Sequence, residues 1–216
     1  MAQAGPYYER CSKLYQEGAL EAAQATCELA LVAEPNDPQA LLLLTRIYLD
    51  TGQLMRAEEK LQALPKTPEA LRLKAQLSLL KGAPSEALTL LQGDQTLEAR
   101  LIRAQALFRM GRLEEAEGEA LRGVSTPEGR LLLAEIRQKT ERLQDALAVL
   151  GHTPKEEVER ARFLLYLGRP QEAVQLLEAL LPRLEGGLRR EALGLLTLSY
   201  KTGGVGAIMP RTSVRG

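Results

Sequence analysis

The sequence predicts an all-α protein made of about six two-helix repeats and one further helix towards its C-terminal end. Three observations support this: a helix-forming composition, a short element that recurs six times, and proline-bearing turns between the copies. Leucine occurs 44 times and alanine 28 times in 216 residues, whereas valine and isoleucine together occur only 11 times. Leucine, alanine, glutamate and arginine favour helices and β-branched residues favour strands, so we expect no extensive sheet.

The recurring element is a glycine followed five residues later by an alanine, with a large residue or proline two places after the glycine. Its alanines are Ala23, Ala57, Ala87, Ala116, Ala146 and Ala173, and they lie 27 to 34 residues apart. The fifth copy has Glu141 in place of the glycine. A small residue also lies 12 positions before each alanine, and these residues are Cys11, Thr45, Ala75, Ala104, Ala134 and Ala161. The pattern predicts a first helix that ends at the glycine and a second helix that packs closely on it through the alanine.

Turns such as Glu34–Pro38 and Leu64–Pro68 separate the copies, because proline begins helices and disfavours helix in the residue before it. The predicted solenoid of residues 4–202 contains repeats at approximately 4–37, 38–67, 68–96, 97–126, 127–153 and 154–184, and a capping helix at 188–202. Residues 203–216 lack leucine and acidic residues, which predicts a flexible tail or a cloning remnant.

The pattern resembles the tetratricopeptide repeat family, whose repeats carry a small residue at position 8, glycine at 15, alanine at 20 and proline near 32. The first repeat matches best, with Cys11, Gly18, Ala23 and Pro35 in these places. The resemblance covers roughly residues 4–184, although the aromatic residue at position 4 survives only as Tyr7 and the later repeats are short. It implies a right-handed superhelical solenoid that acts as a non-catalytic scaffold for protein binding. The richness in Leu, Ala, Arg and Glu also fits a bacterial origin.

The composition provides few side chains that could act in catalysis or bind a metal. The 28 basic and 28 acidic residues balance, which argues against a nucleic-acid surface, and the one histidine, His152, lies in a predicted turn. A structural zinc site usually needs four Cys or His ligands. We therefore expect no catalytic residues, no metal and no cofactor; a hidden helical enzyme would instead require a deep pocket of converging acids. Cys11 and Cys27 could form a disulfide, but we favour two unpaired small buried residues.

The remaining candidate is a binding surface. In this family the first helices line a concave groove, mainly through repeat positions 2, 5, 9, 12 and 13. Carried onto this sequence, these positions give the candidate binding residues Tyr8, Ser12, Tyr15, Arg46, Leu49, Arg72, Gln76, Gln105, Phe108, Glu135, Arg162 and Tyr166. Polar groups flanked by rings suit an extended peptide or a partner helix. The alternative to a binding surface is that the leucines belong to the hydrophobic core and that the polar residues are simply exposed to solvent.

The leading hypothesis is thus a scaffold that binds a peptide or a segment of a partner protein in this groove. A second hypothesis is a self-associating module that stacks through its terminal repeats and exposes apolar surface at Leu188–Tyr200. No run of about 18 apolar residues and no signal-peptide core is visible, so we expect a cytoplasmic protein. A periplasmic location stays open if a signal peptide was removed.

Overall fold

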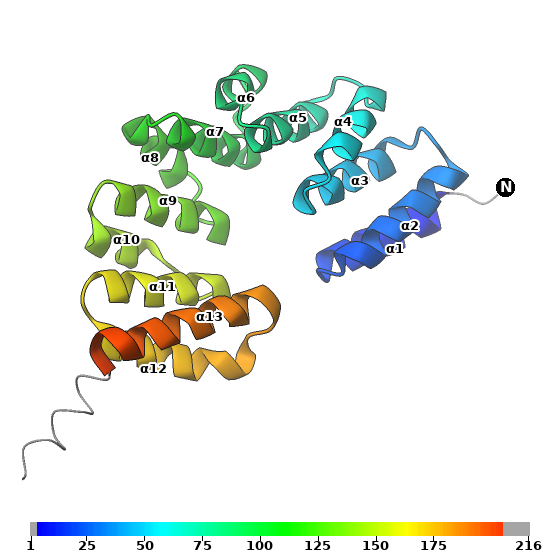
Figure 1. Ribbon diagram of the computed structural model, residues 1–216. Helices are drawn as coiled ribbons and strands as arrows, with labels where there is room; N and C mark the ends of the chain where they lie inside the picture. The colour runs from blue at the N-terminus through cyan, green and yellow to red at the C-terminus, as the bar shows by residue number, and fades with distance from the viewer. Residues whose placement is uncertain (1–3, 205–216) are drawn as a thin grey trace, which may run out of the picture. The chain divides into compact units, whose positions relative to one another are not determined.

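The computed structural model describes residues 4–204, which form thirteen α-helices and two short helical turns (Figure 1). No strand occurs among these residues, so the all-α prediction is confirmed. Gly203 and Gly204 belong to the turn that ends the last helix, and the rest of the predicted tail, 205–216, lies outside the described residues. No helix within the described range is long and apolar enough to cross a bilayer.

The helices fall into two compact units, residues 1–111 and 112–216, and each is treated by itself below. The helices of unit 1 are α1 (Ala4–Gln16), α2 (Leu20–Ala33), α3 (Pro38–Asp50), α4 (Leu54–Ala63), α5 (Pro68–Leu80), α6 (Pro84–Leu90) and α7 (Leu97–Arg109). Those of unit 2 are α8 (Leu113–Leu121), α9 (Pro127–Lys139), α10 (Leu143–Val149), α11 (Pro154–Tyr166), α12 (Pro170–Leu180), η1 (Leu181–Arg183), α13 (Gly186–Ser199) and η2 (Tyr200–Gly204). The odd-numbered helices α1 to α11 are the first helices of the pattern, and the even-numbered helices α2 to α12 are its second helices.

Capping side chains begin the first helices after α1. In each case a side-chain oxygen accepts a hydrogen bond from a backbone N–H of the first turn, and the five caps are Asp37, Thr67, Thr96, Thr126 and Thr153. Proline follows the cap in four of the five helices, where its missing N–H and fixed φ are harmless. In α7 the capping residue, Thr96, is not followed by a proline.

The first helices end in the left-handed conformation that the glycines predict. The five glycines of the element have φ between 73° and 80°, and they are Gly18, Gly52, Gly82, Gly111 and Gly168. Glu141 occupies the sixth place with φ 60°, and it alone among the described non-glycine residues has a positive φ. The backbone turn is therefore kept even where the sequence has lost its glycine.

The small residues of the pattern are the contact points of the core. All six alanines of the element are 0% exposed, and the six small residues that precede them are 0–1% exposed. Leucines fill the space between the helices, as at Leu44, Leu73 and Leu133. Small residues at these places allow the helix backbones to approach closely, which explains why the alanines recur.

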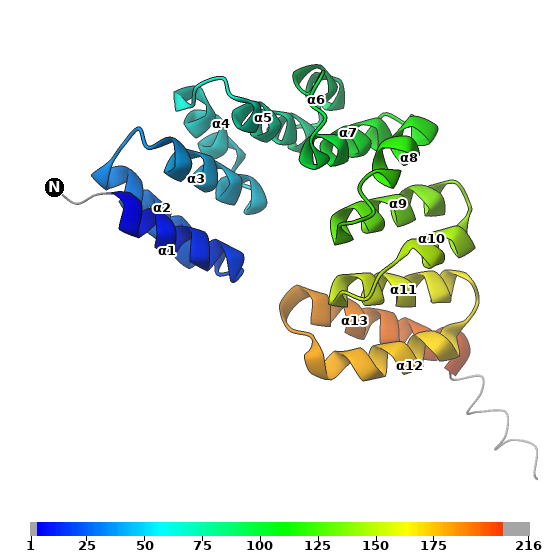
Figure 2. The same ribbon diagram turned by 180° about the vertical axis from the view of Figure 1, so that it is seen from behind.

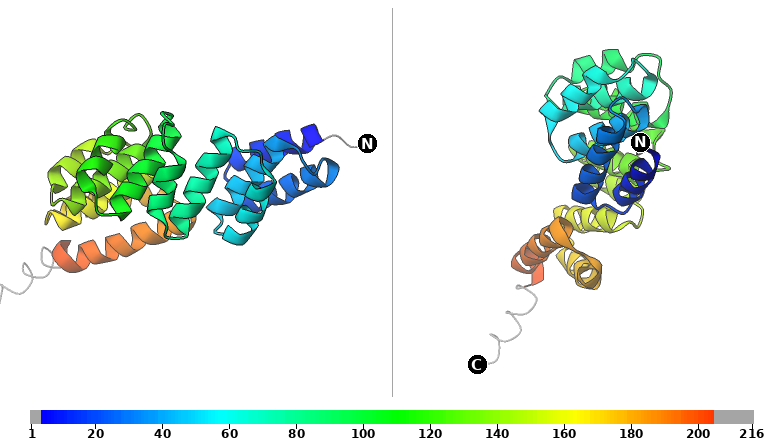
Figure 3. Two further views of the ribbon diagram at one scale, coloured as in Figure 1. Left: turned by 90° about the horizontal axis from the view of Figure 1, so that it is seen from above. Right: turned by 90° about the vertical axis from the view of Figure 1, so that its right-hand side faces the viewer.

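Cys11 and Cys27 are joined by a disulfide that ties α1 to α2, with their Cα atoms 5.4 Å apart. The interpretation of two unpaired cysteines is therefore wrong. Both residues are fully buried where α1 packs against α2, and the two helices lie side by side in Figure 3. The sequence allowed this pairing, and the low cysteine content of the chain argued against it.

The C-terminal helix α13 packs on α11 and α12 (Figure 2). Its buried residues are Ala192 and Ser199, and Leu188, Leu195 and Leu196 pack partly against the same core. The arrangement is that of a first helix which is not followed by a second helix within the described residues.

Candidate functional site

The first helices of unit 1 lie next to one another in chain order. Helix α1 contacts α3, α3 contacts α5, and α5 contacts α7, while the second helices pack behind them. The four helices thus present a common surface, called here the first-helix face, which carries Tyr8, Tyr15, Arg46 and Glu98.

A hollow of about 310 Å³, the unit 1 hollow, opens on this face. It is lined by Tyr8 from α1, by Gln39, Leu42, Leu43 and Arg46 from α3, and by Glu69 and Leu73 from α5. Three leucines supply apolar wall, and the remaining side chains bring polar groups to it. Mixed lining of this kind suits one apolar side chain of a ligand whose backbone meets polar partners.

A polar cluster lies on the same face. Arg46 donates a hydrogen bond from Nη2 to Glu98 Oε1 on α7 at 2.8 Å, and the Tyr15 hydroxyl donates to Asp50 Oδ2 at 2.7 Å. Burial, the hydrogen bond to Asp50 and its charge raise the pKa of Tyr15 to about 12, while the charge of Arg46 acts in the opposite direction. The tyrosine therefore stays a neutral hydrogen-bond donor at physiological pH.

A second ion pair lies at the junction of α5 and α7. Arg72 Nε is 2.7 Å from Asp94 Oδ2, and both side chains are largely buried. Burial opposes ionisation of Asp94, but hydrogen bonds from the Thr96 backbone, the Arg72 guanidinium and the Thr96 hydroxyl outweigh it and lower its pKa to about 2. This pair holds the turn before α7 in place.

In unit 2 the corresponding first helices are α9 and α11. Arg162 on α11 forms ion pairs with Glu159 on the same helix and with Glu191 on α13. Tyr166 is 53% exposed, and its ring centroid lies 6.4 Å from that of Phe163. Arg162 thus links α11 to α13 and Tyr166 presents a ring to solvent.

A buried carboxylate fixes the start of α11. Glu156 is 0% exposed and forms a two-pronged ion pair with Arg130 of α9 at 2.9 Å, while its Oε1 accepts a hydrogen bond from Thr153. The Arg130 guanidinium, helped by the Gly151 backbone and the Thr153 hydroxyl, outweighs the effect of burial and lowers the pKa of Glu156 to about 2. A Cβ on Gly151 would lie 2.8 Å from this carboxylate and 2.9 Å from the Arg130 guanidinium, so a larger residue there would have to displace the ion pair.

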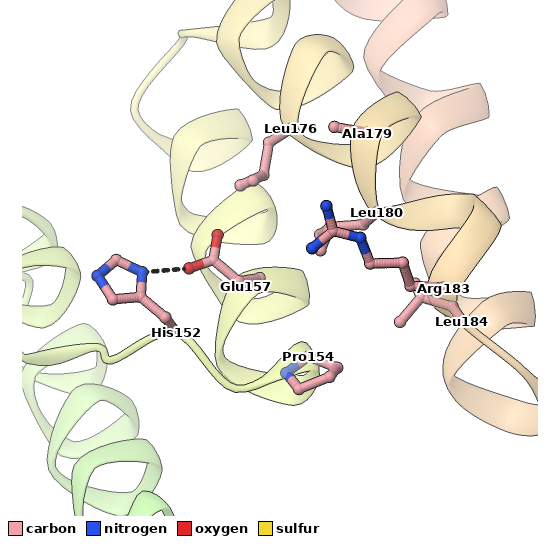
Figure 4. Close-up of a pocket in the computed structure, with 8 residues that line it drawn as sticks. All are labelled: His152, Pro154, Glu157, Leu176, Ala179, Leu180, Arg183 and Leu184. Atoms are coloured by element: carbon pink, nitrogen blue, oxygen red, sulfur yellow. Dashed lines mark hydrogen bonds and ion pairs between the residues drawn. The ribbon is translucent and has the colours of Figure 1, made fainter.

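Unit 2 also contains a cavity of about 340 Å³ between the start of α11 and the end of α12 (Figure 4). Figure 4 shows His152 and Glu157 turned towards each other, with Nδ1 2.8 Å from Oε1, beside a wall of Leu176 and Leu180. His152 is otherwise exposed, as expected for a turn residue. The eight described residues that line the cavity include no serine, cysteine or lysine, so it offers a histidine–carboxylate pair without a nucleophile. Nor do His, Cys, Asp or Glu side chains gather in threes to hold a metal anywhere in residues 4–204.

Comparisons with known proteins agree with the repeat pattern. The family model described as tetratricopeptide repeat matches residues 14–77, and the model described as anaphase-promoting complex, cyclosome, subunit 3 matches residues 55–123. Residues 14–77 thus match the tetratricopeptide repeat family, and the described residues have the fold of solved tetratricopeptide-repeat structures. A repeat fold of this family supports a protein–protein interaction scaffold. No curated protein matches the sequence.

Solved structures show the same fold at low identity. A tetratricopeptide repeat protein from Parabacteroides merdae is similar with a TM-score of 0.73 and 17% identity, over 91% of this chain and 84% of that one. TTC0263 from Thermus thermophilus is similar with a TM-score of 0.63 and 23% identity, over 81% of this chain and 98% of that one. The Cut9–Hcn1 hetero-tetramer of APC/C contains a chain that is similar with a TM-score of 0.68 and 13% identity, over 91% of this chain and 42% of that one.

The structure brings part of the candidate set together. Tyr8 and Arg46 line the unit 1 hollow, and Tyr15 joins the polar cluster. Others lie singly on the first helices as half-buried or exposed residues, and these are Ser12, Gln76, Gln105, Phe108 and Glu135. Leu49 is a correction, because it is only 4% exposed and packs in the core.

The three candidate arginines all form ion pairs. Arg46, Arg72 and Arg162 are each engaged by a carboxylate within their own unit. Two residues of the polar cluster were missed, Asp50 and Glu98. Both occupy groove positions of the family pattern, 13 and 2, so a complete tally of those positions would have found them.

Proposed function

We propose that the protein is a scaffold that holds an extended segment of a partner protein against the first-helix face of unit 1, with one apolar side chain in the unit 1 hollow. The observation that carries the proposal is that three successive first helices contribute to this hollow, through Tyr8, Leu42 and Leu73. A ligand that crosses several repeats gains contacts from rigid elements, which lowers the ordering cost of binding.

The chemistry of the first-helix face limits which partner segments can bind to it. Burying an apolar side chain against Leu42, Leu43 and Leu73 contributes roughly 1.5–3 kcal/mol. The charge of Arg46 is already neutralised by Glu98, and Glu69 adds a carboxylate at the rim. We therefore expect the apolar residue to be flanked by neutral or basic residues rather than by acidic ones.

Adjacent tyrosines provide a matched test. Tyr8 lines the hollow, whereas Tyr7 lies on the same helix, is exposed and does not line it. Peptides that bind the full chain are first selected from a phage-displayed library. Their affinity for Tyr8→Ser should be at least about fivefold weaker than for the unchanged chain, a loss of about 1 kcal/mol. Their affinity for Tyr7→Ser should equal that for the unchanged chain. Equal binding to both variants, or no enrichment of peptides, would contradict the proposal.

Self-association through the terminal repeats is the second candidate function. Helix α13 exposes Leu193 and Leu198 at 42% and 47%, which is the apolar surface that this alternative requires. Light scattering across a concentration series tests it. A mass that rises with concentration and returns to that of a monomer in Leu193→Gln/Leu198→Gln would favour this alternative, and a constant monomer mass would remove it.

A further inference from the structure

The solvent-facing side of α2 is apolar, in contrast to an ordinary surface helix. Helix α2 buries Ala23, Cys27, Ala30 and Leu31 against its neighbours. On the opposite side it exposes four apolar residues at helical spacing, called here the α2 outer stripe: Ala22, Ala25, Leu29 and Val32. Leu29 and Val32 are 53% and 79% exposed. A helix with apolar residues on two opposite sides generally has both sides covered.

The other second helices of the chain serve as internal references. The residue before the buried alanine is Ala22 in α2 and is charged in every other second helix, where it is Arg56, Glu86, Glu115, Asp145 or Glu172. All six of these residues are exposed. Six positions after the alanine, Leu29 stands where α4 and α12 have the smaller Ala63 and Ala179, both exposed, whereas α6, α8 and α10 have already ended. The repeat architecture therefore does not require an apolar outer face, and α2 alone among the second helices has one.

The stretch of chain that carries the α2 outer stripe is acidic, although Arg56 of α4 lies over the Tyr48 ring, whose hydroxyl donates to Glu28. No lysine or arginine occurs between Lys13 and Arg46, and this stretch carries five carboxylates: Glu17, Glu21, Glu28, Glu34 and Asp37. The whole chain balances 28 acidic against 28 basic residues, so the segment is strongly acidic for this protein. An apolar stripe with acidic flanks is complementary to an apolar stripe with basic flanks.

We propose that the α2 outer stripe docks an amphipathic helix of a partner protein whose apolar side is bordered by lysine or arginine. Ala22 and Ala25 allow the backbone of the partner helix to approach, and Leu29 and Val32 project as knobs between its side chains. The 14 residues of α2 span about 21 Å, the length of a partner helix of four turns. A second copy is disfavoured, because pairing α2 with itself would bring carboxylates of like charge together.

The test uses the full chain and a defined probe. The probe is a fluorescein-labelled 18-residue helical peptide with leucine at every third or fourth position and lysine beside the leucines, and its twin has glutamate in place of lysine. Fluorescence anisotropy should show saturable binding of the lysine peptide and binding of the glutamate twin that is at least about tenfold weaker. Leu29→Gln/Val32→Gln should weaken the lysine peptide at least about tenfold. These substitutions add no charge and lie on the solvent side, so circular dichroism should show unchanged helicity.

A matched control comes from α4, where Met55 is an isolated exposed apolar residue at 86%. Met55→Gln should leave binding unchanged, and so should Tyr8→Ser, which separates this surface from the first-helix face. Equal affinity of the chain and Leu29→Gln/Val32→Gln for the lysine peptide would overturn the proposal, as would equal binding of the two peptides. A dimer in light scattering that Leu29→Gln/Val32→Gln converts to a monomer would also overturn it, because the stripe would then be covered by a second copy.

Discussion

Arg46 on α3 and Glu98 on α7 form an ion pair at 2.8 Å although 52 residues and the whole of α5 separate them in the chain. Both side chains are about one-third exposed, so solvent weakens their attraction. The pair nevertheless joins two first helices that are not consecutive. Substituting the two residues therefore tests whether this ion pair helps to hold the first-helix face of unit 1 together as one surface.

A double-mutant cycle of Arg46→Gln and Glu98→Gln should give a coupling energy of about 0.5–1 kcal/mol in urea unfolding at low salt. The coupling should shrink at high salt because the pair is partly solvated. The same cycle for Arg169 and Glu172, which are more exposed and lie three residues apart in one turn, serves as the reference. No coupling between Arg46 and Glu98 beyond that of the reference pair would show that the ion pair does not stabilise the face.

Glu156 should make the protein sensitive to acid. Its pKa is about 2 in the folded chain and about 4.5 without its partners, so the unfolded chain takes up the proton first as the pH falls. The stabilisation is complete above pH 4.5 and is lost progressively towards pH 2. Glu156→Gln should lower the free energy of unfolding at pH 7 by about 2–4 kcal/mol, because Arg130 loses its buried partner.

Urea titrations at pH 7 and pH 3 measure this effect. The stability difference between the two pH values should be smaller in Glu156→Gln than in the unchanged chain. The control is Glu172→Gln, since Arg169 lowers the pKa of Glu172 only at a half-exposed site, and this variant should keep more of the pH dependence than Glu156→Gln does. An unchanged difference in Glu156→Gln would mean that other carboxyl groups, such as Asp94, dominate the acid response.

The disulfide between Cys11 and Cys27 should stabilise the first helix pair. It closes a loop with a sequence separation of 16, for which the loss of chain entropy in the unfolded state predicts about 3 kcal/mol. Thermal unfolding followed by circular dichroism should therefore shift downward on adding a reductant. Cys11→Ala/Cys27→Ala should not respond to the reductant, and a similar shift in this variant would indicate that the reductant acts elsewhere.

The sequence predicted the helices and their contact points because both depend on local chemistry. Threonine caps, helix-ending glycines and buried alanines recur at fixed distances, so one repeat supports the interpretation of the next. The candidate site was harder to predict from the sequence, because the roles of its residues depend on partners far along the chain. Arg46 looked like a free cation until Glu98 was placed beside it, and Leu49 looked like a groove residue until its burial was known.

The apolar outer side of α2 was hidden from the sequence for a related reason. Leucine and alanine are so frequent in this chain that Leu29 and Ala25 do not stand out as surface residues. Only the burial of Cys27 and Leu31 on the same helix shows which side is exposed. The disulfide was missed because cysteine content is a property of a whole protein, whereas pairing depends on a single contact.

Glu141 offers a test of how much the repeat depends on glycine. It adopts φ 60°, a conformation that costs a residue with a Cβ roughly 1 kcal/mol relative to glycine, and the other five copies of the element carry glycine there. Glu141→Gly should therefore raise the free energy of unfolding by about 1 kcal/mol. The reverse substitution, Gly111→Glu, should lower it by a similar amount, because a Cβ on Gly111 would meet no atom within 4 Å and only the backbone conformation opposes it. Urea unfolding of the two variants measures both changes. If both variants are destabilised equally, the Glu141 side chain stabilises the fold by more than its left-handed backbone conformation destabilises it.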